Sequence, residues 1–309
     1  MTQFAIEARN IVKTFRDGEV RALDGVSLNV PEGQVFGLLG PNGSGKTTMV
    51  RILSTILAPD SGEAVVAGHD VTSQADAVRR SIGLAGQYAT VDENLTGFEN
   101  LRMIGRLNHL TKTQASATAH ELLERFGLTD AGQRPAKTYS GGMRRRLDLS
   151  ASLVGRPSIL FLDEPTAGID PVARREIWDL LFRLAAEGTT LFVTTHYMDE
   201  AEQCERIALM RAGEIIALDS PSGLKKTAFP EPLYELLPKN PISASEIESL
   251  RQSELFSDIE PYGLKYHVSV ANQDAFEAFS NDENGLFMIR EIQPTLEDVF
   301  IRMVEGVNR

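Results

Sequence analysis

The fold of this protein follows from one stretch of its sequence, Gly40-Pro41-Asn42-Gly43-Ser44-Gly45-Lys46-Thr47-Thr48. The stretch fits the pattern G-x-x-x-x-G-K-[ST] at every fixed position, and this pattern is typical of a loop that binds the phosphates of a nucleoside triphosphate. In such a loop, glycines let backbone N–H groups turn toward the phosphates, and the N-terminus of the following helix stabilises their charge. Lys46 is therefore expected to contact the β- and γ-phosphates, and the Thr47 hydroxyl is expected to bind Mg²⁺.

The flanking sequence contains the strand and the helix that such a loop requires. The apolar run 35–39 predicts a buried strand before the loop, and apolar residues recur after it at helical spacing, at Met49, Ile52, Leu53 and Ile56. The alternative is a glycine-rich turn with an unrelated lysine, which does not account for a strand and a helix in these places. The sequence therefore predicts an α/β nucleotide-binding fold.

The composition limits the classes of protein to which the chain can belong. Its 309 residues suffice for one large domain and a small one, and 43 acidic against 31 basic residues give a net charge of -12. Such an acidic chain is not expected to bind nucleic acid, although a locally basic site can still bind ATP. The single cysteine, Cys204, cannot form a disulfide within the chain, which fits a reducing cytoplasm.

The sequence shows no segment that would insert into a membrane. No apolar run approaches the roughly 18 residues that cross a bilayer, and residues 1–12 lack the basic start and apolar block of a signal peptide. A role at a membrane would therefore require separate membrane subunits.

Polar residues follow three of the predicted buried strands. Gln87 follows the strand 82–85, Asp163-Glu164 follow the apolar run 158–162, and His196 follows the strand 190–194. Since α/β sheets bind ligands at the carboxyl ends of their strands, we expect these side chains to gather there.

Each of these polar residues has either a catalytic or a purely structural role. Asp163 and Glu164 suit phosphoryl transfer, in which one carboxylate holds Mg²⁺ and the other polarises water. A capping pair before Pro165 is the alternative, and the phosphate loop favours the functional interpretation. His196 taken alone is more often a hydrogen-bonded core histidine than a catalytic group.

The region between residues 88 and 139 has helical periodicity and predicts a helical insertion. It ends at Ser140-Gly141-Gly142, where a serine and two glycines open a helix and form a second possible phosphate cradle. The arginines at 144–146 follow directly. Because the run is short and the chain is acidic, we interpret them as a solvated helix face rather than a nucleic-acid patch.

Alternating apolar residues in 4–12 and 26–30, with Asp17-Gly18 as a turn, predict an antiparallel sheet before the phosphate loop. Phe15 ends the first strand, where it is either part of the core or a surface on which adenine stacks. Without further context the core is favoured.

Prolines are concentrated in residues 220–241 and predict a linker. It separates a nucleotide-binding domain, residues 1–219, from a small α/β domain, residues 242–309, with a first strand already indicated at 233–237. Further strands are predicted at 264–270 and 286–289, and helices at 244–250, 275–279 and 295–304. This order suggests a small α/β sandwich of the ferredoxin-like type.

Taken in chain order, these motifs resemble an ATP-binding cassette (ABC) ATPase. The resemblance covers residues 4–218 and also includes Ala167-Gly168-Ile169-Asp170. Residues 86–97, the arginine-rich helix and residues 195–202 look like the ATP-binding subunits of daunorubicin-resistance-type (ABC-2-type) drug exporters, and residues 294–300 resemble a phrase of the same subgroup. The fold that this implies is a P-loop cassette with a mixed central sheet, an N-terminal antiparallel β subdomain and a helical insertion, followed by a small α/β domain.

The resemblance implies a role for each motif residue. Phe15 would stack on adenine, Lys46 and Thr47 would hold phosphates and Mg²⁺, and Asp163 would support the metal. Glu164 would be the general base, Gln87 would sense the metal and the attacking water, and His196 would contact the γ-phosphate.

The resemblance also implies partners. Ser140, Gly141 and Gly142 would reach ATP bound by a second copy of the chain or a homologous cassette, with Asp170 at the same interface. Integral-membrane permease subunits would hold the protein at the cytoplasmic face of the cell membrane, and no nucleic acid is expected. The alternative is a soluble ABC ATPase acting on a ribosome, DNA or a protein complex, but such proteins usually have fused cassettes or a long coiled coil, which this sequence lacks.

Four positions depart from the usual family pattern: Phe15, Tyr139, Met143 and Ile169. None of these changes removes a charged or hydroxyl group that is assigned to the chemistry. Met143 stands where glutamine is usual, and a thioether cannot donate the hydrogen bonds of an amide.

Overall fold

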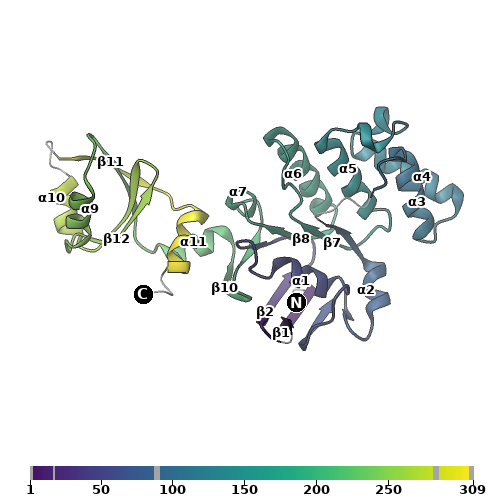
Figure 1. Cartoon of the computed structure of the whole chain (residues 1–309), viewed down its shortest axis with the longest axis horizontal. Coiled ribbons are helices and arrows are strands. Elements are labelled where there is room, and N and C mark those ends of the chain that lie inside the picture. Colours follow the sequence, from purple (N-terminus) through teal and green to yellow (C-terminus); the bar gives the residue numbers. More distant parts are fainter. Residues whose placement is uncertain (1–2, 17, 87–90, 281–284, 306–309) are drawn as a thin grey trace. The chain divides into compact units, whose positions relative to one another are not determined.

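The computed structural model describes residues 3–16, 18–86, 91–280 and 285–305. The chain divides into two compact units, Met1–Pro221 and Ser222–Arg309, here called the N-terminal and C-terminal units (Figure 1). Each unit has its own sheet structure and its own apolar core.

An antiparallel sheet opens the N-terminal unit, as the alternation predicts. Its strand order is β2-β1-β4-β5. The strands are β1 (Phe4–Phe15), β2 (Val20–Pro31), β4 (Ser61–Val66) and β5 (His69–Asp70). β1 and β2 form a long hairpin in which Phe15 pairs with Val20.

A second, mixed sheet of six strands carries the candidate site, in the order β10-β9-β3-β8-β7-β6. The strands are β3 (Val35–Leu39), β6 (Ile82–Ala85), β7 (Ile159–Asp163), β8 (Thr190–Thr195), β9 (Arg206–Arg211) and β10 (Glu214–Asp219). All neighbours pair in parallel except β10, which is antiparallel to β9. Every residue of β3, β7 and β8 is buried, which explains why these strands are continuous apolar runs in the sequence.

The apolar core of the N-terminal unit joins the two sheets. Helix α1 (Lys46–Leu53) contacts strands of both sheets and contributes Met49 and Ile52, each fully buried. The expectation that Ile56 extends this apolar face is wrong, because α1 ends at Leu53 and Ile56 is 62% exposed. The backbone of Thr55 is left-handed, with φ +64°, and so it turns the chain out of the helix.

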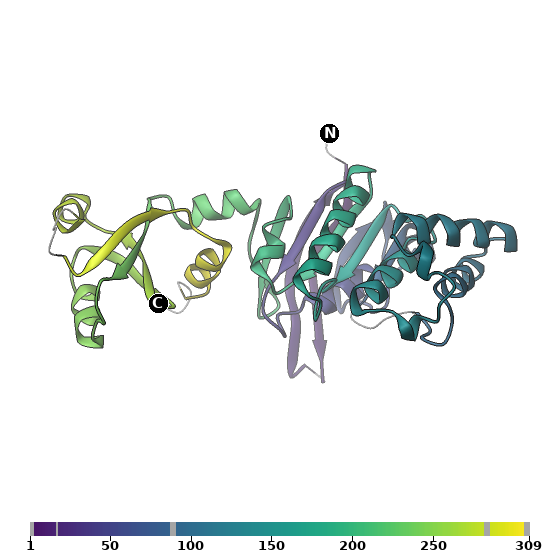
Figure 2. The same cartoon turned by 90° about the horizontal axis from the view of Figure 1, so that it is seen from above.

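The predicted helical insertion is present. The remaining helices of the N-terminal unit are α2 (Ala75–Ser81), α3 (Gly97–Leu107), α4 (Lys112–Arg125), α5 (Gly141–Ser152), α6 (Pro171–Ala186) and α7 (Met198–Ala201). Helices α3 and α4 pack on each other, and each begins with a capping box, at Thr96 and Thr111. Figure 2 shows α3 and α4 at one end of the unit, beside α5.

The C-terminal unit contains a four-stranded antiparallel sheet in the order β12-β13-β11-β14. Its elements are α8 (Pro221–Ala228), β11 (Leu233–Pro238), α9 (Ala244–Arg251), β12 (Phe256–Tyr262), β13 (Lys265–Val270), α10 (Gln273–Ser280), β14 (Phe287–Ile292) and α11 (Leu296–Glu305). From β11 to β14 the order β-α-β-β-α-β is that of the ferredoxin-like arrangement.

The C-terminal unit differs from the sequence-based prediction between residues 220 and 241 and at β12, a strand that was not predicted. Residues 220–241, predicted as a linker, contain the helix α8, which was not predicted, and the strand β11, which agrees with the strand indicated at 233–237. Pro221 is the first residue of α8, where a missing N–H costs no helical hydrogen bond, and Pro238 is the last residue of β11. Prolines at element ends are therefore compatible with regular structure here.

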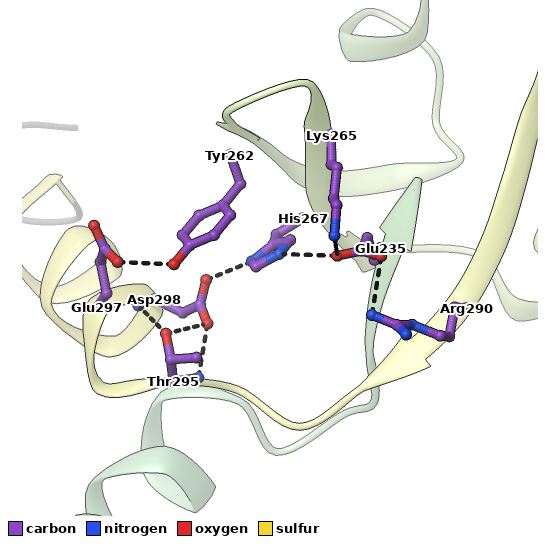
Figure 3. Close-up of polar contacts among 8 residues, drawn as sticks. All are labelled: Glu235, Tyr262, Lys265, His267, Arg290, Thr295, Glu297 and Asp298. Atoms are coloured by element: carbon purple, nitrogen blue, oxygen red, sulfur yellow. Dashed lines mark hydrogen bonds and ion pairs between the residues drawn. The ribbon is translucent and has the colours of Figure 1, made fainter. Parts of the chain in front are cut away.

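A polar cluster ties α11 to the sheet (Figure 3). The Nδ1 atom of His267 on β13 lies 2.6 Å from Oδ1 of Asp298 on α11. The other carboxylate oxygen, Oδ2, accepts hydrogen bonds from the backbone N–H and the hydroxyl of Thr295, each at 2.7 Å, and so completes a cap of α11. Burial alone raises the pKa of Asp298, but the hydrogen bonds from His267 and Thr295 outweigh burial and leave that pKa below its ordinary value.

We expect Asp298→Asn to loosen α11, because an amide cannot replace a carboxylate that accepts from both His267 and Thr295. The expected loss is about 1–3 kcal/mol of local stability, measured as faster amide hydrogen exchange of Leu296–Glu305 in the full chain. Glu297→Gln is the control, because Glu297 is an exposed neighbour on the same helix and an amide oxygen can still accept the hydrogen bond from Tyr262.

We expect the stability that Asp298 gives to α11 to fall at acid pH. Because the pKa of Asp298 is lowered in the folded chain, its carboxylate stabilises α11 above the unfolded pKa of about 3.9, and this contribution is lost as the pH falls below that value. Exchange in Asp298→Asn should lack this acid-dependent component. Equal exchange in the wild type and Asp298→Asn at neutral pH would contradict the assignment.

Candidate active site

The candidate site lies at the carboxyl ends of three adjacent parallel strands. β8 lies between β3 and β7, so the phosphate loop after β3 and the acidic pair at the end of β7 flank the end of β8. Backbone hydrogen bonds fix this arrangement. The N–H of Gly40 donates to the carbonyl of Thr195 at 3.3 Å, and the N–H of Glu164 donates to the carbonyl of Thr194 at 3.2 Å.

The glycines of the loop are required by space and by backbone conformation. A Cβ on Gly40 would lie 2.2 Å from the carbonyl oxygen of Met210, and a Cβ on Gly45 would lie 2.4 Å from that of Ala22. Gly45 also has φ +109°, whereas Gly43, with φ +81°, faces no atom within 4 Å. The loop therefore approaches β2 and β9 so closely that only glycine fits at Gly40 and Gly45.

Lys46 is buried beneath this loop, with 5% of its surface exposed. Its Nζ donates to the carbonyl oxygens of Gly40 at 2.7 Å and Pro41 at 3.0 Å, and it lies 3.9 Å from Oε1 of Glu164. Burial lowers the pKa of Lys46, while the charges of Glu164 and Asp163 partly offset this effect. A buried cation that interacts mainly with backbone carbonyls is well suited to bind a phosphate.

The structure fits a triphosphate in a further respect. The Ser44 hydroxyl is buried in the loop and has no hydrogen-bond partner among the residues that the structure describes. Loop residues Asn42, Gly43 and Gly45 to Thr48 line a hollow of about 420 Å³ together with Val20–Ala22, Glu164 and Ala212. Pro41 and Asn42 are exposed at the tip of the loop. The hollow thus combines a cation with the N-terminus of α1, and both attract phosphate.

Thr47 and Asp163 form a small oxygen cluster that suits Mg²⁺. The Thr47 hydroxyl donates to Oδ1 of Asp163 at 3.3 Å, and the Thr194 hydroxyl donates to the same oxygen at 2.6 Å. No group of three or more His, Cys, Asp or Glu side chains in the described part of the chain could hold a metal. A site with so few protein ligands suits Mg²⁺, which usually keeps waters and binds substrate phosphates.

Glu164 has an unusual backbone conformation, with φ +49°. A non-glycine residue in the left-handed region costs about 1–3 kcal/mol and persists only where the surroundings enforce it. Here the Glu164 N–H is held by both the carbonyl and the hydroxyl of Thr194, the latter at 3.1 Å. Nδ1 of His196 lies 3.3 Å from Oε1 of Glu164, without the geometry of a hydrogen bond. The structure thus brings Lys46, Glu164 and His196 together.

Other predicted residues lie at the N-termini of α5 and α6, and Gly141 among them lines a hollow of about 460 Å³ together with Glu164. Ser140 caps α5 by accepting the N–H of Met143 at 3.2 Å, and Asp170 caps α6 by accepting the N–H groups of Val172 at 3.1 Å and Ala173 at 3.0 Å. Ser140, Gly141 and Asp170 are exposed, whereas a Cβ on Gly142 would lie 2.8 Å from the Cβ of Ala173. The helix starts of α5 and α6 therefore lie side by side on the surface.

Phe15 and Gln87 are the two remaining residues predicted for the site. Phe15 is 38% exposed, and Nζ of Lys13 lies 5.8 Å from the centre of its ring. Its strand partner Val20 lines the hollow beside the phosphate loop. Gln87 lies outside the described residues, and the chain is described again from Val91.

Glu200 on α7, which is only 2% exposed, was not predicted from the sequence as part of the site. Its carboxylate accepts hydrogen bonds from the hydroxyls of Thr166 and Thr195, the latter at 2.7 Å, and lies 3.7 Å from Nε of Arg174. Thr166 follows Glu164 by two residues and Thr195 precedes His196, so Glu200 joins the two segments. The available signal was an acidic residue in the resemblance stretch 195–202, but only the fold shows that it is buried.

We expect Gly45→Ala to destabilise the loop by about 1–3 kcal/mol, because the added methyl group meets a backbone carbonyl that cannot move freely. Binding of a fluorescent ATP analogue should be lost. Gly43→Ala is the matched control, for which only the left-handed backbone costs about 1 kcal/mol. Thermal melting and nucleotide titration of both variants measure the difference, and equal behaviour would contradict the steric argument.

We expect Glu200→Ala to cost about 1–3 kcal/mol for each hydroxyl left without an acceptor and to slow ATP hydrolysis. The exposed neighbour Asp199 provides the control, because Asp199→Ala should change stability by no more than about 0.5 kcal/mol. Thermal melting and steady-state ATPase rates test this. The bridging role would be wrong if the two variants behaved alike.

None of the helices in the described ranges is long and apolar enough to cross a membrane.

Comparison with known proteins identifies the family. The ABC transporter family model matches residues 23–167. The daunorubicin/doxorubicin resistance ATP-binding protein DrrA of Streptomyces peucetius is 44% identical over 307 residues, which are 97% of this chain and 92% of that protein. The doxorubicin resistance ATP-binding protein DrrA of Mycobacterium tuberculosis H37Rv is 47% identical over 237 residues, covering 76% of this chain and 71% of that protein.

Solved structures agree with these relatives. CbiO1 of Clostridium perfringens, part of the ABC transporter complex cbiONQ, superimposes with a TM-score of 0.66 at 28% identity and covers 72% of this chain and 90% of its own. The dimeric, post-hydrolysis ATP-binding cassette MJ0796, bound to ADP and Pi, has a TM-score of 0.64 at 28% identity, with coverages of 70% and 98%. The chain therefore belongs to the ABC transporter family, among the ATP-binding proteins of the DrrA type.

Proposed function

We propose that this chain is the ATP-hydrolysing subunit of an exporter for a drug-like or lipophilic substrate. One observation supports the chemical part of the proposal: the ends of β3 and β7, on either side of β8, bring Glu164 within 3.9 Å of the buried Lys46. A carboxylate beside a phosphate-binding lysine is positioned to act on water at the terminal phosphate. The near full-length similarity to a daunorubicin/doxorubicin resistance protein supports export as the purpose.

Each residue of the site has a distinct role in binding or hydrolysing ATP. The loop Gly40–Thr48 and Lys46 bind the phosphates, Phe15 stacks on the adenine, and His196 contacts the γ-phosphate. Thr47 and Asp163, with Gln87, would hold Mg²⁺, which when bound would supply charge to neutralise the phosphates. Glu164 acts as the general base toward water.

The site is one half of a composite. Ser140, Gly141 and Gly142 bind ATP held by a second copy or a homologous cassette, and Asp170 lies at the same interface. Exposure of Ser140 and Gly141 at a helix N-terminus supports this role, since free N–H groups there attract phosphate. The dimeric state of the MJ0796 cassette supports the same assembly.

Transport itself requires partners. Integral-membrane permease subunits bind the cassette at the cytoplasmic face of the cell membrane and contact the substrate. The alternative of a soluble ATPase acting on a ribosome, DNA or a protein complex is not favoured, because relatives matched over most of their length are drug-resistance proteins. Co-purification of the full chain with a multi-helix membrane protein tests this choice, and a stably ribosome-bound or DNA-bound pool would reverse it.

We expect Glu164→Gln to reduce ATP hydrolysis by about 10²–10⁴-fold, because the amide cannot accept a proton from water. ATP binding should persist, and dimers should accumulate because hydrolysis no longer reopens them. Steady-state ATPase rates, nucleotide titration and size-exclusion chromatography with ATP measure the three outcomes.

Lys46→Ala is the contrasting variant, since it should abolish binding and dimer formation together. Normal turnover in Glu164→Gln would refute the assignment of the general base.

A further inference from the structure

Arg145 on α5 differs from the arginines on either side of it. The sequence predicts a solvated helix face over residues 144–146, and this prediction is wrong for Arg145, because only 11% of its side chain is exposed. Arg144 and Arg146 pair with Glu93 at 2.8 Å and Glu176 at 3.5 Å, and 36% and 25% of their side chains are exposed. Arg145 therefore points inward while its neighbours lie nearer the surface.

The guanidinium of Arg145 joins three segments of the candidate site. Its Nε donates to the carbonyl oxygen of Pro165 at 2.6 Å, and its Nη1 donates to the carbonyl oxygen of Gly86 at 2.8 Å. Nη1 also donates to Oδ2 of Asp148, one turn along α5, at 3.1 Å. Asp148 is 1% exposed, so a buried ion pair anchors the guanidinium to its own helix.

The positions of the two carbonyls connect Arg145 with the chemistry. Pro165 directly follows Glu164, and Gly86 directly precedes Gln87. Arg145 thus holds the backbone next to two residues to which the proposed function assigns the handling of water and metal. A lysine has no fixed fork and could not donate to both carbonyls with this geometry.

The cost of burying this guanidinium indicates that its position is well defined. A buried charge is tolerated only where it is paired and hydrogen-bonded. Here Nε and Nη1 donate to the Asp148 carboxylate and two carbonyls, while the buried Nη2 has no hydrogen-bond partner among the described residues. Removing the guanidinium would leave Asp148 without this partner inside the protein.

We propose that Arg145 is a positioning residue that couples the two ATP sites of the dimer. The inference rests on the proposed function, in which Ser140–Gly142 at the start of α5 bind the ATP of the partner copy. Arg145 lies on the same helix, about 7.5 Å farther along its axis. When α5 moves to bind ATP across the interface, Arg145 moves the carbonyls of Pro165 and Gly86 with it. ATP in one site therefore adjusts Glu164 of the other site.

Coupling between the two ATP sites can be measured as cooperativity of ATP hydrolysis. Allosteric coupling between sites is typically about 5- to 150-fold in affinity or response, so wild-type ATPase activity should rise cooperatively with ATP concentration. Breaking the link should lower the Hill coefficient toward about 1, its value for independent sites. Binding of nucleotide to the phosphate loop should remain within about twofold, since Arg145 does not line that hollow.

The experiment compares Arg145→Gln and Arg145→Lys with the control Arg146→Gln in the full chain. Each is measured for melting temperature, binding of a fluorescent ATP analogue, and ATPase rate against ATP concentration. We expect both Arg145 variants to lose cooperativity and Arg146→Gln to retain it. Arg145→Lys keeps the charge and the aliphatic stem, so it decides the question if Arg145→Gln melts at a lower temperature.

The outcomes separate this inference from the proposed function. Wild-type cooperativity retained in Arg145→Lys would overturn the inference and leave the dimeric ATPase intact. Failure of Arg145→Lys to fold would also overturn it, because Arg145 would then serve stability alone. Absence of cooperativity and of ATP-dependent dimers in the wild type would instead refute the composite site on which the inference depends.

Discussion

Parallel pairing of β8 between β3 and β7 is the constraint on which the candidate site depends. These strands are buried on every residue, so their register is fixed by packing as well as by hydrogen bonds. Leu39 pairs with Thr195 and Asp163 pairs with Thr194. The strand ends therefore finish level with one another, and Lys46, Glu164 and His196 converge although they are far apart in the sequence. Residues that follow the carboxyl ends of neighbouring parallel strands come together because the strands themselves are paired.

The hydroxyl groups of β8 extend this constraint from backbone to chemistry. Thr194 binds the Asp163 carboxylate and the Glu164 N–H, whereas Thr195 binds Glu200 on α7. Adjacent threonines of one strand thus orient the acidic pair on one side and the segment that begins with His196 on the other. Arg145 adds a connection from α5 to the same region. The acidic pair is consequently held from the sheet and from the helical layer.

Much of this arrangement could be predicted from the sequence, because the loop, the apolar strands and the polar residues after them are local signals. Long-range polar contacts could not. Glu200 and Arg145 look like surface residues in the sequence, and their burial depends on which face of α7 or α5 packs inward. The helix α8 was missed because proline content predicts a break, whereas Pro221 stands at a helix start. Strand β12 was missed because Pro261 interrupts its apolar pattern.

The left-handed backbone of Glu164 lowers the stability of the fold at the residue that supplies the proposed general base. Glycine is the residue that this conformation favours, and it would release strain of about 1–3 kcal/mol. Glycine would also delete the carboxylate. A protein selected only for resistance to heat would thus tend to discard the group that the proposed hydrolysis requires, and stabilising designs based on this scaffold should keep Glu164 fixed.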